Sequence, residues 1–182
     1  MAERIAEIVV LAEDLNHVNF VRQFLQRKGH HARTIRVVPV PGGRGSGEQY
    51  VREHYPEEVS YYRNRSTRRR AALVVVIDAD AKSVVGRERE LQTGLVHTSG
   101  VPREPHEAIV LLIPKRHIET WICCLLGEHV DELTDYTPRR GVHEEIKPAA
   151  VTFFEWSRPH YAVPDHCVES LRRGLAEVHR IP

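Results

Sequence analysis

The chain has 182 residues, of which 41% are hydrophobic, and a formal net charge of +1. A chain of this length can bury a self-sufficient core without disulfides, and one domain with an appendage is expected. The three cysteines, two of them adjacent, are not the even set that a disulfide framework requires. The longest apolar runs, at 74–77 and 109–114, are far too short to cross a bilayer, and the first residues do not resemble a signal peptide. We therefore expect a cytoplasmic protein without a membrane-spanning segment.

Short apolar runs rich in β-branched residues alternate with segments of helical periodicity. The run at 71–77 is almost continuous Val and Ile, which is typical of a central strand buried on both faces. Pro39 and Pro41 shorten the run at 33–40 and favour an edge position for it. Pro56 is expected to interrupt the second helix. The predicted strands are 5–12, 33–40, 71–77 and 108–113, and the predicted helices are 17–28, 48–59, 84–96 and 117–126.

Strands that alternate with helices need crossover connections, and such connections produce a mostly parallel sheet. The predicted fold class is therefore α/β, with a Rossmann-like core at residues 1–126 in which about four strands are flanked by helices. Residues 127–182 are richer in Pro, His and aromatic side chains, and only one helix, at about 165–179, is predicted there. We expect this segment to form a cap or extension packed on the core.

Charged side chains follow three of the predicted strands at the point where each strand ends. They are Glu13 and Asp14 after the first strand, Asp78 and Asp80 after the third, and Lys115 and Arg116 after the fourth. Ligands of parallel α/β sheets bind at this end of the strands, so these side chains should converge. Converging carboxylates repel one another unless a cation joins them, and Mg²⁺ or Mn²⁺ prefers such oxygen ligands. The same acids could instead cap the following helices, because Asp and Glu favour helix N-termini.

Two of these strand ends resemble the Toprim domain of topoisomerases, DnaG-type primases and OLD-family nucleases. The segments that carry the resemblance are VVLAE at 9–13, VVVIDAD at 74–80 and IPKRHIETW at 113–121. The last of them is similar to a segment of small stand-alone bacterial Toprim-like proteins. The resemblance implies a Rossmann-like fold in which Glu13, Asp78 and Asp80 together bind Mg²⁺. The family usually has Gly after the glutamate, where this chain has Asp14.

Further residues near these strand ends are candidates for binding or catalysis. Lys115 could neutralise charge that develops on a phosphate. Glu119, in the first turn of the fourth predicted helix, is either another acid of the site or a favourable helix-end charge. The glycine-rich loop at 42–47, with Arg44 and Ser46, either cradles a phosphate through backbone N–H groups or is a flexible turn. It lacks the Gly-Lys-Ser/Thr ending of a nucleotide P-loop.

An arginine run precedes the third strand, so it should lie at the opposite end of the sheet from Asp78. It consists of Arg63, Arg65, Arg68, Arg69 and Arg70. Arg68 and Arg69 are candidate contacts to a nucleic-acid backbone, as is Arg116 at the other end of the sheet. A solvated polar loop is the alternative, because charged runs are commonly exposed.

These features favour a Mg²⁺- or Mn²⁺-dependent nuclease or another phosphoryl-transfer protein, with Glu13, Lys115 and Glu119 as its catalytic residues. The Toprim resemblance implies nucleic acid as a partner and a bacterial defence or mobile-element module with an ATPase, while self-association is left open. A receiver-like signalling domain is an alternative, because it also has acids after its first strand, an Asp after its third and a late Lys. A third alternative is a nucleic-acid-binding or partner-binding module without catalytic activity.

Overall fold

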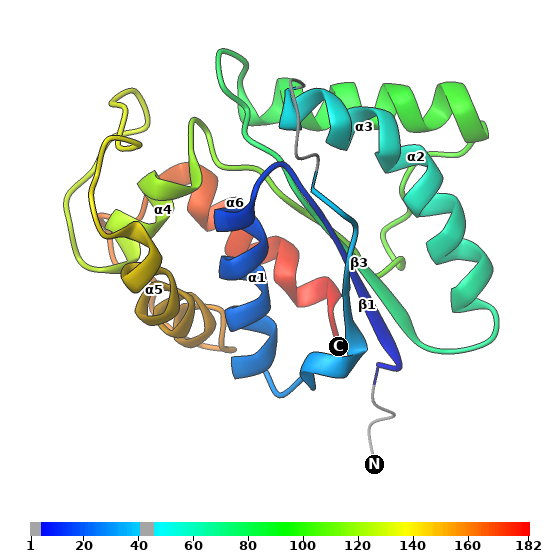
Figure 1. The fold of residues 1–182 in the computed structure, drawn as a ribbon, viewed down its shortest axis with the longest axis horizontal. Helices are drawn as coiled ribbons and strands as arrows, with labels where there is room; N and C mark the ends of the chain where they lie inside the picture. Colours follow the sequence, from blue (N-terminus) through cyan, green and yellow to red (C-terminus); the bar gives the residue numbers. More distant parts are fainter. Residues whose placement is uncertain (1–4, 41–45) are drawn as a thin grey trace.

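The computed structural model describes residues 5–40 and 46–182. Four parallel strands form one sheet in the order β2-β1-β3-β4, with helices on both faces (Figure 1). The predicted α/β fold class is confirmed, and the architecture is consistent with a Rossmann-like fold. The strands are β1 (Glu7–Ala12), β2 (Ile35–Val37), β3 (Ala71–Val76) and β4 (Ile109–Leu112). The α-helices are α1 (Leu15–Arg27), α2 (Gly47–Ser66), α3 (Val84–Ser99), α4 (Ile118–Leu125), α5 (Val142–Trp156) and α6 (Glu169–Glu177). In the described segments, no helix combines the length and apolar character that a membrane span requires.

β1 and β3 form the centre of the sheet and pair in register along their whole length. Every residue of β3 is buried, as its continuous Val-rich sequence predicted. β2 is an edge strand of three residues, which confirms the edge position that the prolines favoured. The backbone N–H of Val38 makes one more bond to β1, and Pro39, which has no N–H, follows it.

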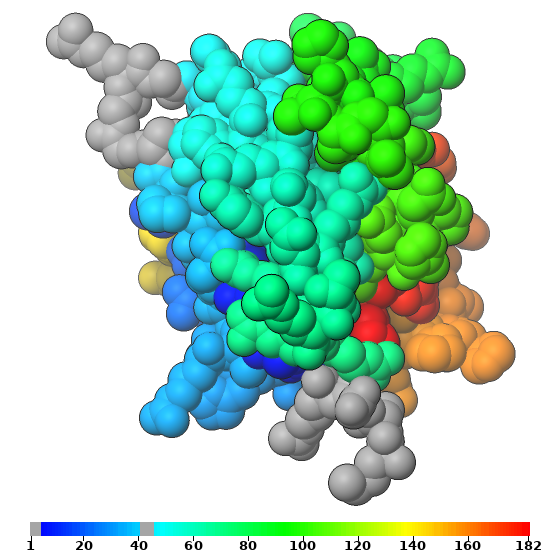
Figure 2. All heavy atoms as spheres, turned by 90° about the vertical axis from the view of Figure 1, so that its right-hand side faces the viewer, coloured from blue at the N-terminus to red at the C-terminus, as the bar shows by residue number. Residues whose placement is uncertain are grey.

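Side chains alternate between the two faces of the sheet and pack against different helices. Val74 and Val76 belong to one apolar cluster, to which α1, α4, α5 and α6 contribute. Leu73 and Val75 belong to a second cluster, which α2 and α3 cover on the opposite face (Figure 2). Burial on both faces is what an all-parallel sheet requires. Because the strands are parallel, the carboxyl ends of β1, β3 and β4 lie at the same end of the sheet.

α2 differs from the prediction that Pro56 would interrupt it. The helix is continuous over Gly47–Ser66, so it extends beyond the predicted range 48–59 and includes Arg63 and Arg65 of the arginine run. A proline inside a helix removes one backbone hydrogen bond. Burial of Tyr55 and Val59 against the sheet offsets that loss, since each such side chain contributes about 1.5–3 kcal/mol.

The C-terminal segment 127–182 contains two α-helices, where the sequence predicted one. The missed helix is α5, which has Pro148 in its interior, a position at which proline usually breaks a helix. α5 packs along α1, and the ring of Phe153 makes edge-to-face contacts with Phe20 and Phe24 at centroid distances of 5.3 and 4.9 Å. Side chains of α5 and α6 are therefore part of the core on one face of the sheet.

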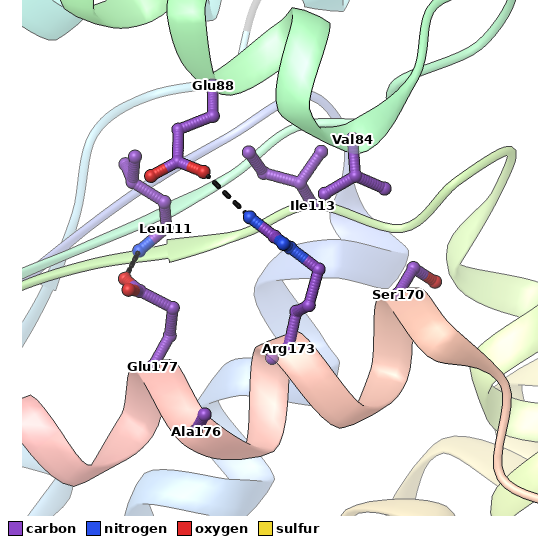
Figure 3. A pocket seen from close by; sticks show the side chains of 9 residues that line it. Val84, Glu88, Leu111, Ile113, Ser170, Arg173, Ala176 and Glu177 are labelled. Atoms are coloured by element: carbon purple, nitrogen blue, oxygen red, sulfur yellow. Dashed lines mark hydrogen bonds and ion pairs between the residues drawn. The ribbon is translucent and has the colours of Figure 1, made fainter.

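α6 covers the open edge of β4 (Figure 3). Glu177 Oε2 accepts a hydrogen bond from the backbone N–H of Leu111 at 3.0 Å, in place of a neighbouring strand. A cavity of about 240 Å³ lies beside this edge, and the ion pair of Arg173 on α6 with Glu88 on α3 spans it. An edge strand covered in this way is protected from pairing with another chain.

Candidate metal centre

The carboxyl ends of β3 and β4 bring two aspartates and a histidine together. Ligand atoms of Asp78, Asp80 and His117 all lie within 4.8 Å of one another, close enough to share one metal ion. Asp78 is buried, His117 is partly buried and Asp80 is exposed, so the group reaches from the core to the surface. The two aspartates follow β3, and His117 lies between β4 and α4. A group that could hold a metal is therefore present at the end of the sheet where the sequence predicted one.

Asp78 is 6% exposed, and each of its carboxylate oxygens faces a histidine. His17 Nε2 lies 3.1 Å from Oδ1, and His117 Nδ1 lies 3.6 Å from Oδ2. Burial alone would raise the pKa of Asp78, but the two imidazoles, His17 above all, hold it below its usual value. Asp78 is therefore an anion at neutral pH, which is the state that a metal ligand needs.

His17, which is not among the residues predicted for the site, is fully buried beside Asp78. Burial would lower the pKa of His17, but the charge and hydrogen bond of Asp78 outweigh this and raise it to about 9. Within the described residues, His17 Nδ1 has no hydrogen-bond partner, and it lies 3.4 Å from Asp14 Oδ1. One feature of the sequence pointed to His17. It lies four residues before Val21, on the buried face of α1, and it shortly follows the acids Glu13 and Asp14.

Asp14, the acid that directly follows Glu13, is the N-cap of α1. Its Oδ1 accepts a hydrogen bond from the backbone N–H of His17 at 2.9 Å. Such a cap stabilises a helix by about 0.5–2 kcal/mol, and here it starts α1 at the position that sets His17 against Asp78. The helix-capping alternative therefore describes Asp14. It does not describe the aspartates after β3, because Ser83 caps α3.

Asp80 sits in a turn that Lys115 holds. The φ angle of Asp80 is 53°, in the left-handed region that residues other than glycine rarely adopt. Lys115 Nζ donates hydrogen bonds to the carbonyl oxygens of Asp80 and Lys82 at 3.1 and 2.9 Å. Lys115 thus lies at the site, where it fixes the backbone of the turn that carries Asp80.

Arg87 supports the same turn from inside the protein. It is 2% exposed, and its Nε donates to the carbonyl oxygen of Asp78 at 3.0 Å. Its Nη1 pairs with Glu48 on α2 and Glu90 on α3, and its Nη2 lies 3.7 Å from Asp80 Oδ2. The buried charge is tolerated because several acids and a carbonyl oxygen surround it. One guanidinium group therefore connects α2, α3 and the turn after β3.

Glu13 lies beside Asp78, although it is not one of the three residues that ligand spacing groups together. Its Oε1 accepts a hydrogen bond from the backbone N–H of Asp78 at 2.7 Å. Burial, and then repulsion from Asp78, raise the pKa of Glu13 to about 7. The start of α2 packs against it, since a Cβ on Gly47 would lie 2.5 Å from the carbonyl oxygen of Glu13. Only glycine fits there.

The predicted residues Glu119 and Arg116 lie at the same end of the sheet, and both have protein partners. Glu119 is 8% exposed, and its Oε1 accepts a hydrogen bond from Asn16 Nδ2 at 3.0 Å, which ties α4 to α1. Arg116 Nη1 donates to the carbonyl oxygen of Leu133 at 2.6 Å. Glu119 thus positions α4, and Arg116 anchors the segment that follows it.

The other predicted contact residues are placed differently. Ser46 is the N-cap of α2, so its hydroxyl group serves the helix. Arg44 lies outside the described residues. Arg68 and Arg69 precede β3 and so lie at the opposite end of the sheet, where Arg69 Nη2 bonds to Glu7 Oε2 at 3.2 Å.

The donor set at the metal centre suits a hard or borderline divalent cation. Mg²⁺ and Mn²⁺ prefer carboxylate oxygens, whereas imidazole is a ligand of transition metals, and Mn²⁺ accepts both. The residues fit such an ion, because the buried Asp78 is ionised and has a second carboxylate and an imidazole within reach.

No protein-family model, curated protein or solved structure matches the chain. The function must therefore be inferred from the site itself.

Proposed function

We propose that the chain is a divalent-metal-dependent phosphodiesterase that acts on nucleic acid. The observation that carries the proposal is the convergence of Asp78, Asp80 and His117 within 4.8 Å at the carboxyl end of the sheet. Parallel α/β proteins bind their ligands at this end. The resemblance of the segments around Glu13 and Asp78 to Toprim domains supports a phosphodiester as the substrate.

Three side chains hold the metal in this proposal, and others keep them in place. Asp78, Asp80 and His117 are the ligands. The bound ion would polarise a phosphoryl oxygen and lower the pKa of a bound water. His17 orients the carboxylate of Asp78 by its 3.1 Å contact with Oδ1, which leaves Oδ2 on the side of His117. Arg87 holds the backbone of the turn that carries both aspartates.

Two further groups act toward the substrate. Oε1 of Glu13 is occupied by the backbone N–H of Asp78, so we assign Oε2 to accept a proton from the attacking water. Among the described residues, Lys115 bonds to carbonyl oxygens and not to a carboxylate, so its charge is available to a phosphate. Glu119 acts indirectly, through the bond that positions α4 on α1.

The receiver-like alternative has less support. A phosphate acceptor must be accessible, whereas Asp78 is 6% exposed and has a histidine at each oxygen. Labelling by a phosphoramidate donor that is lost in D78N would reverse this preference.

Calorimetric titration with Mn²⁺ and Mg²⁺ tests the metal centre. We expect the wild-type chain to bind Mn²⁺ more tightly than Mg²⁺, and D78N or D80N to weaken binding on the order of 100-fold. D165N changes an exposed aspartate on the connection before α6, and it should leave the titration unchanged. A wild-type chain that binds neither ion would refute the proposal.

Cleavage of labelled DNA and RNA in the presence of Mn²⁺ tests the chemistry. We expect products with the wild-type chain and none with D78N. A protein that binds Mn²⁺ but cleaves neither polymer would instead be a non-catalytic binding module. The Toprim resemblance is also the basis for proposing an ATPase partner in a bacterial defence module. The cleavage assay is therefore repeated in the presence of an ATPase whose gene neighbours the gene for this chain.

A further inference from the structure

An open hollow with positive side chains lies at the opposite end of the sheet from the metal centre. Its volume is about 700 Å³, and it lies where α2 ends and β3 begins, at the teal end of α2 in Figure 2. The residues that line it are Asn64, Arg65, Thr67, Arg68 and Arg69. Each of these side chains can donate hydrogen bonds, and most are exposed. The hollow therefore offers donors and positive charge to an anion.

Three guanidinium groups beside this hollow share one carboxylate. Arg65 Nη1 and Arg69 Nη2 lie 3.1 and 3.2 Å from Glu7 Oε2. Arg36 Nε lies 3.7 Å from Glu7 Oε1, and Arg36 has a second acidic partner in Glu58. A single carboxylate carries one negative charge, so it cannot neutralise both Arg65 and Arg69. Among the described residues, positive charge therefore remains on this surface, and Arg69 is 51% exposed.

Arg63 belongs to the same arginine run in the sequence but serves a different purpose. Its Nε and Nη2 donate to the two oxygens of Glu107 at 2.7 and 3.1 Å. This bidentate pair holds the segment before β4 in place, and it fixes the Arg63 side chain in one orientation. The structure thus separates one structural arginine from those that line the hollow.

We propose that Arg65, Arg68 and Arg69 bind the phosphodiester backbone of a polynucleotide at a site separate from the metal centre. Guanidinium groups pair with phosphate oxygens in fork-like geometry, and several together give affinity without reading base sequence. The inference rests on the nucleic-acid substrate proposed above and adds how that substrate is held.

A polymer, unlike a small anion, is long enough to reach both ends of the sheet. The path from Ala71 to Asp78 spans roughly 23 Å at about 3.3 Å per residue, which equals about seven base pairs of duplex. A substrate shorter than this cannot contact the arginines while it is bound at the metal centre. The site should therefore affect long substrates and leave small ones unchanged.

Fluorescence anisotropy in EDTA with a labelled DNA duplex of about 24 base pairs measures this site without the metal. We expect the double variant R68S/R69S to weaken binding about tenfold or more, and to lower the slope of log affinity against log salt by about 1.8. The matched control R22S/R89S removes the same charge from exposed positions on α1 and α3, and it should bind as the wild type does. Equal binding by the two double variants would overturn the proposal.

Two further measurements identify the ligand. E7Q removes the carboxylate that competes for Arg65 and Arg69, so it should tighten duplex binding severalfold, with circular dichroism as the check on folding. Weaker binding by a folded E7Q would contradict the proposal. An RNA duplex of equal length shows which polynucleotide is preferred. If poly-glutamate of equal charge competes as well as nucleic acid, the surface binds acidic protein and the polynucleotide assignment fails.

The test of the arginine site can be distinguished from the test of the metal centre. In Mn²⁺, R68S/R69S should raise the KM for the long duplex about tenfold and leave kcat unchanged. It should not affect hydrolysis of a small chromogenic phosphodiester, which is too short to reach the arginines. Duplex binding that depends on these arginines, without any cleavage, would leave this site standing and refute the phosphodiesterase. Cleavage that R68S/R69S does not alter would refute this site alone.

Discussion

Replacing Glu13 by Gln should stabilise the metal-free protein at pH 8 and change its stability little at pH 4. The pKa of Glu13 is raised from 4.5 to about 7 in the folded protein, so the folded state holds this proton more tightly than the unfolded chain does. The stability that the proton provides is complete below pH 4.5 and is lost as the pH rises through 7. The difference corresponds to about 3 kcal/mol in the free energy of unfolding.

The contacts of Glu13 show what the substitution keeps and what it removes. A glutamine Oε1 can still accept the hydrogen bond from the backbone N–H of Asp78, which is 2.7 Å long in the wild type. The repulsion between Glu13 and Asp78 disappears, but so does the attraction of Glu13 to the protonated His17. We therefore expect a gain of about 2 kcal/mol at pH 8, less than the full value.

Urea unfolding followed by circular dichroism in EDTA, at pH 4 and pH 8, measures this effect. E144Q, which changes an exposed glutamate at the start of α5, is the control and should show no gain that depends on pH. Saturating Mn²⁺ should stabilise the wild type by about 2.7 kcal/mol at 100 times the dissociation constant. Lower stability of E13Q than of the wild type at pH 8, or an equal gain at both pH values, would contradict a raised pKa of Glu13 in the folded protein.

Four other substitutions test the packing and the ligand set. G47A should destabilise the fold by about 1–3 kcal/mol, because its Cβ would lie 2.5 Å from the carbonyl oxygen of Glu13. G94A, with open space around it in α3, should stabilise the fold by about 0.5–1 kcal/mol. Thermal melts in which G47A is at least as stable as G94A would contradict both expectations. F153A should cost about 3–5 kcal/mol in urea unfolding, and a loss below about 1 kcal/mol would show that α5 lies outside the cooperative core. H117Q should weaken Mn²⁺ binding on the order of tenfold in calorimetry, while unfolding in EDTA shows no comparable loss.

The sequence by itself determined the order of strands and helices and the end of the sheet at which the acids gather. Both results depend on local patterns. The continuous Val run of β3 is typical of a strand buried on both faces, and parallel connections then deliver Glu13 and Asp78 to the same end of the sheet. Local rules failed where tertiary packing outweighed them. Pro56 and Pro148 both lie inside continuous helices, because apolar burial along those helices offsets the lost hydrogen bonds.

Only the tertiary structure decided which side chains meet at the metal centre. His17 and His117 come from segments far apart in the chain, and the place of His17 on the apolar face of α1 does not by itself show that both histidines face Asp78. Their meeting depends on how α1 and α4 pack against the sheet, and the Asn16–Glu119 hydrogen bond contributes to that packing. The acids were predictable because strand direction alone places them. The histidines were not, because helix packing and side-chain orientation, which depend on the whole core, bring them to the same carboxylate.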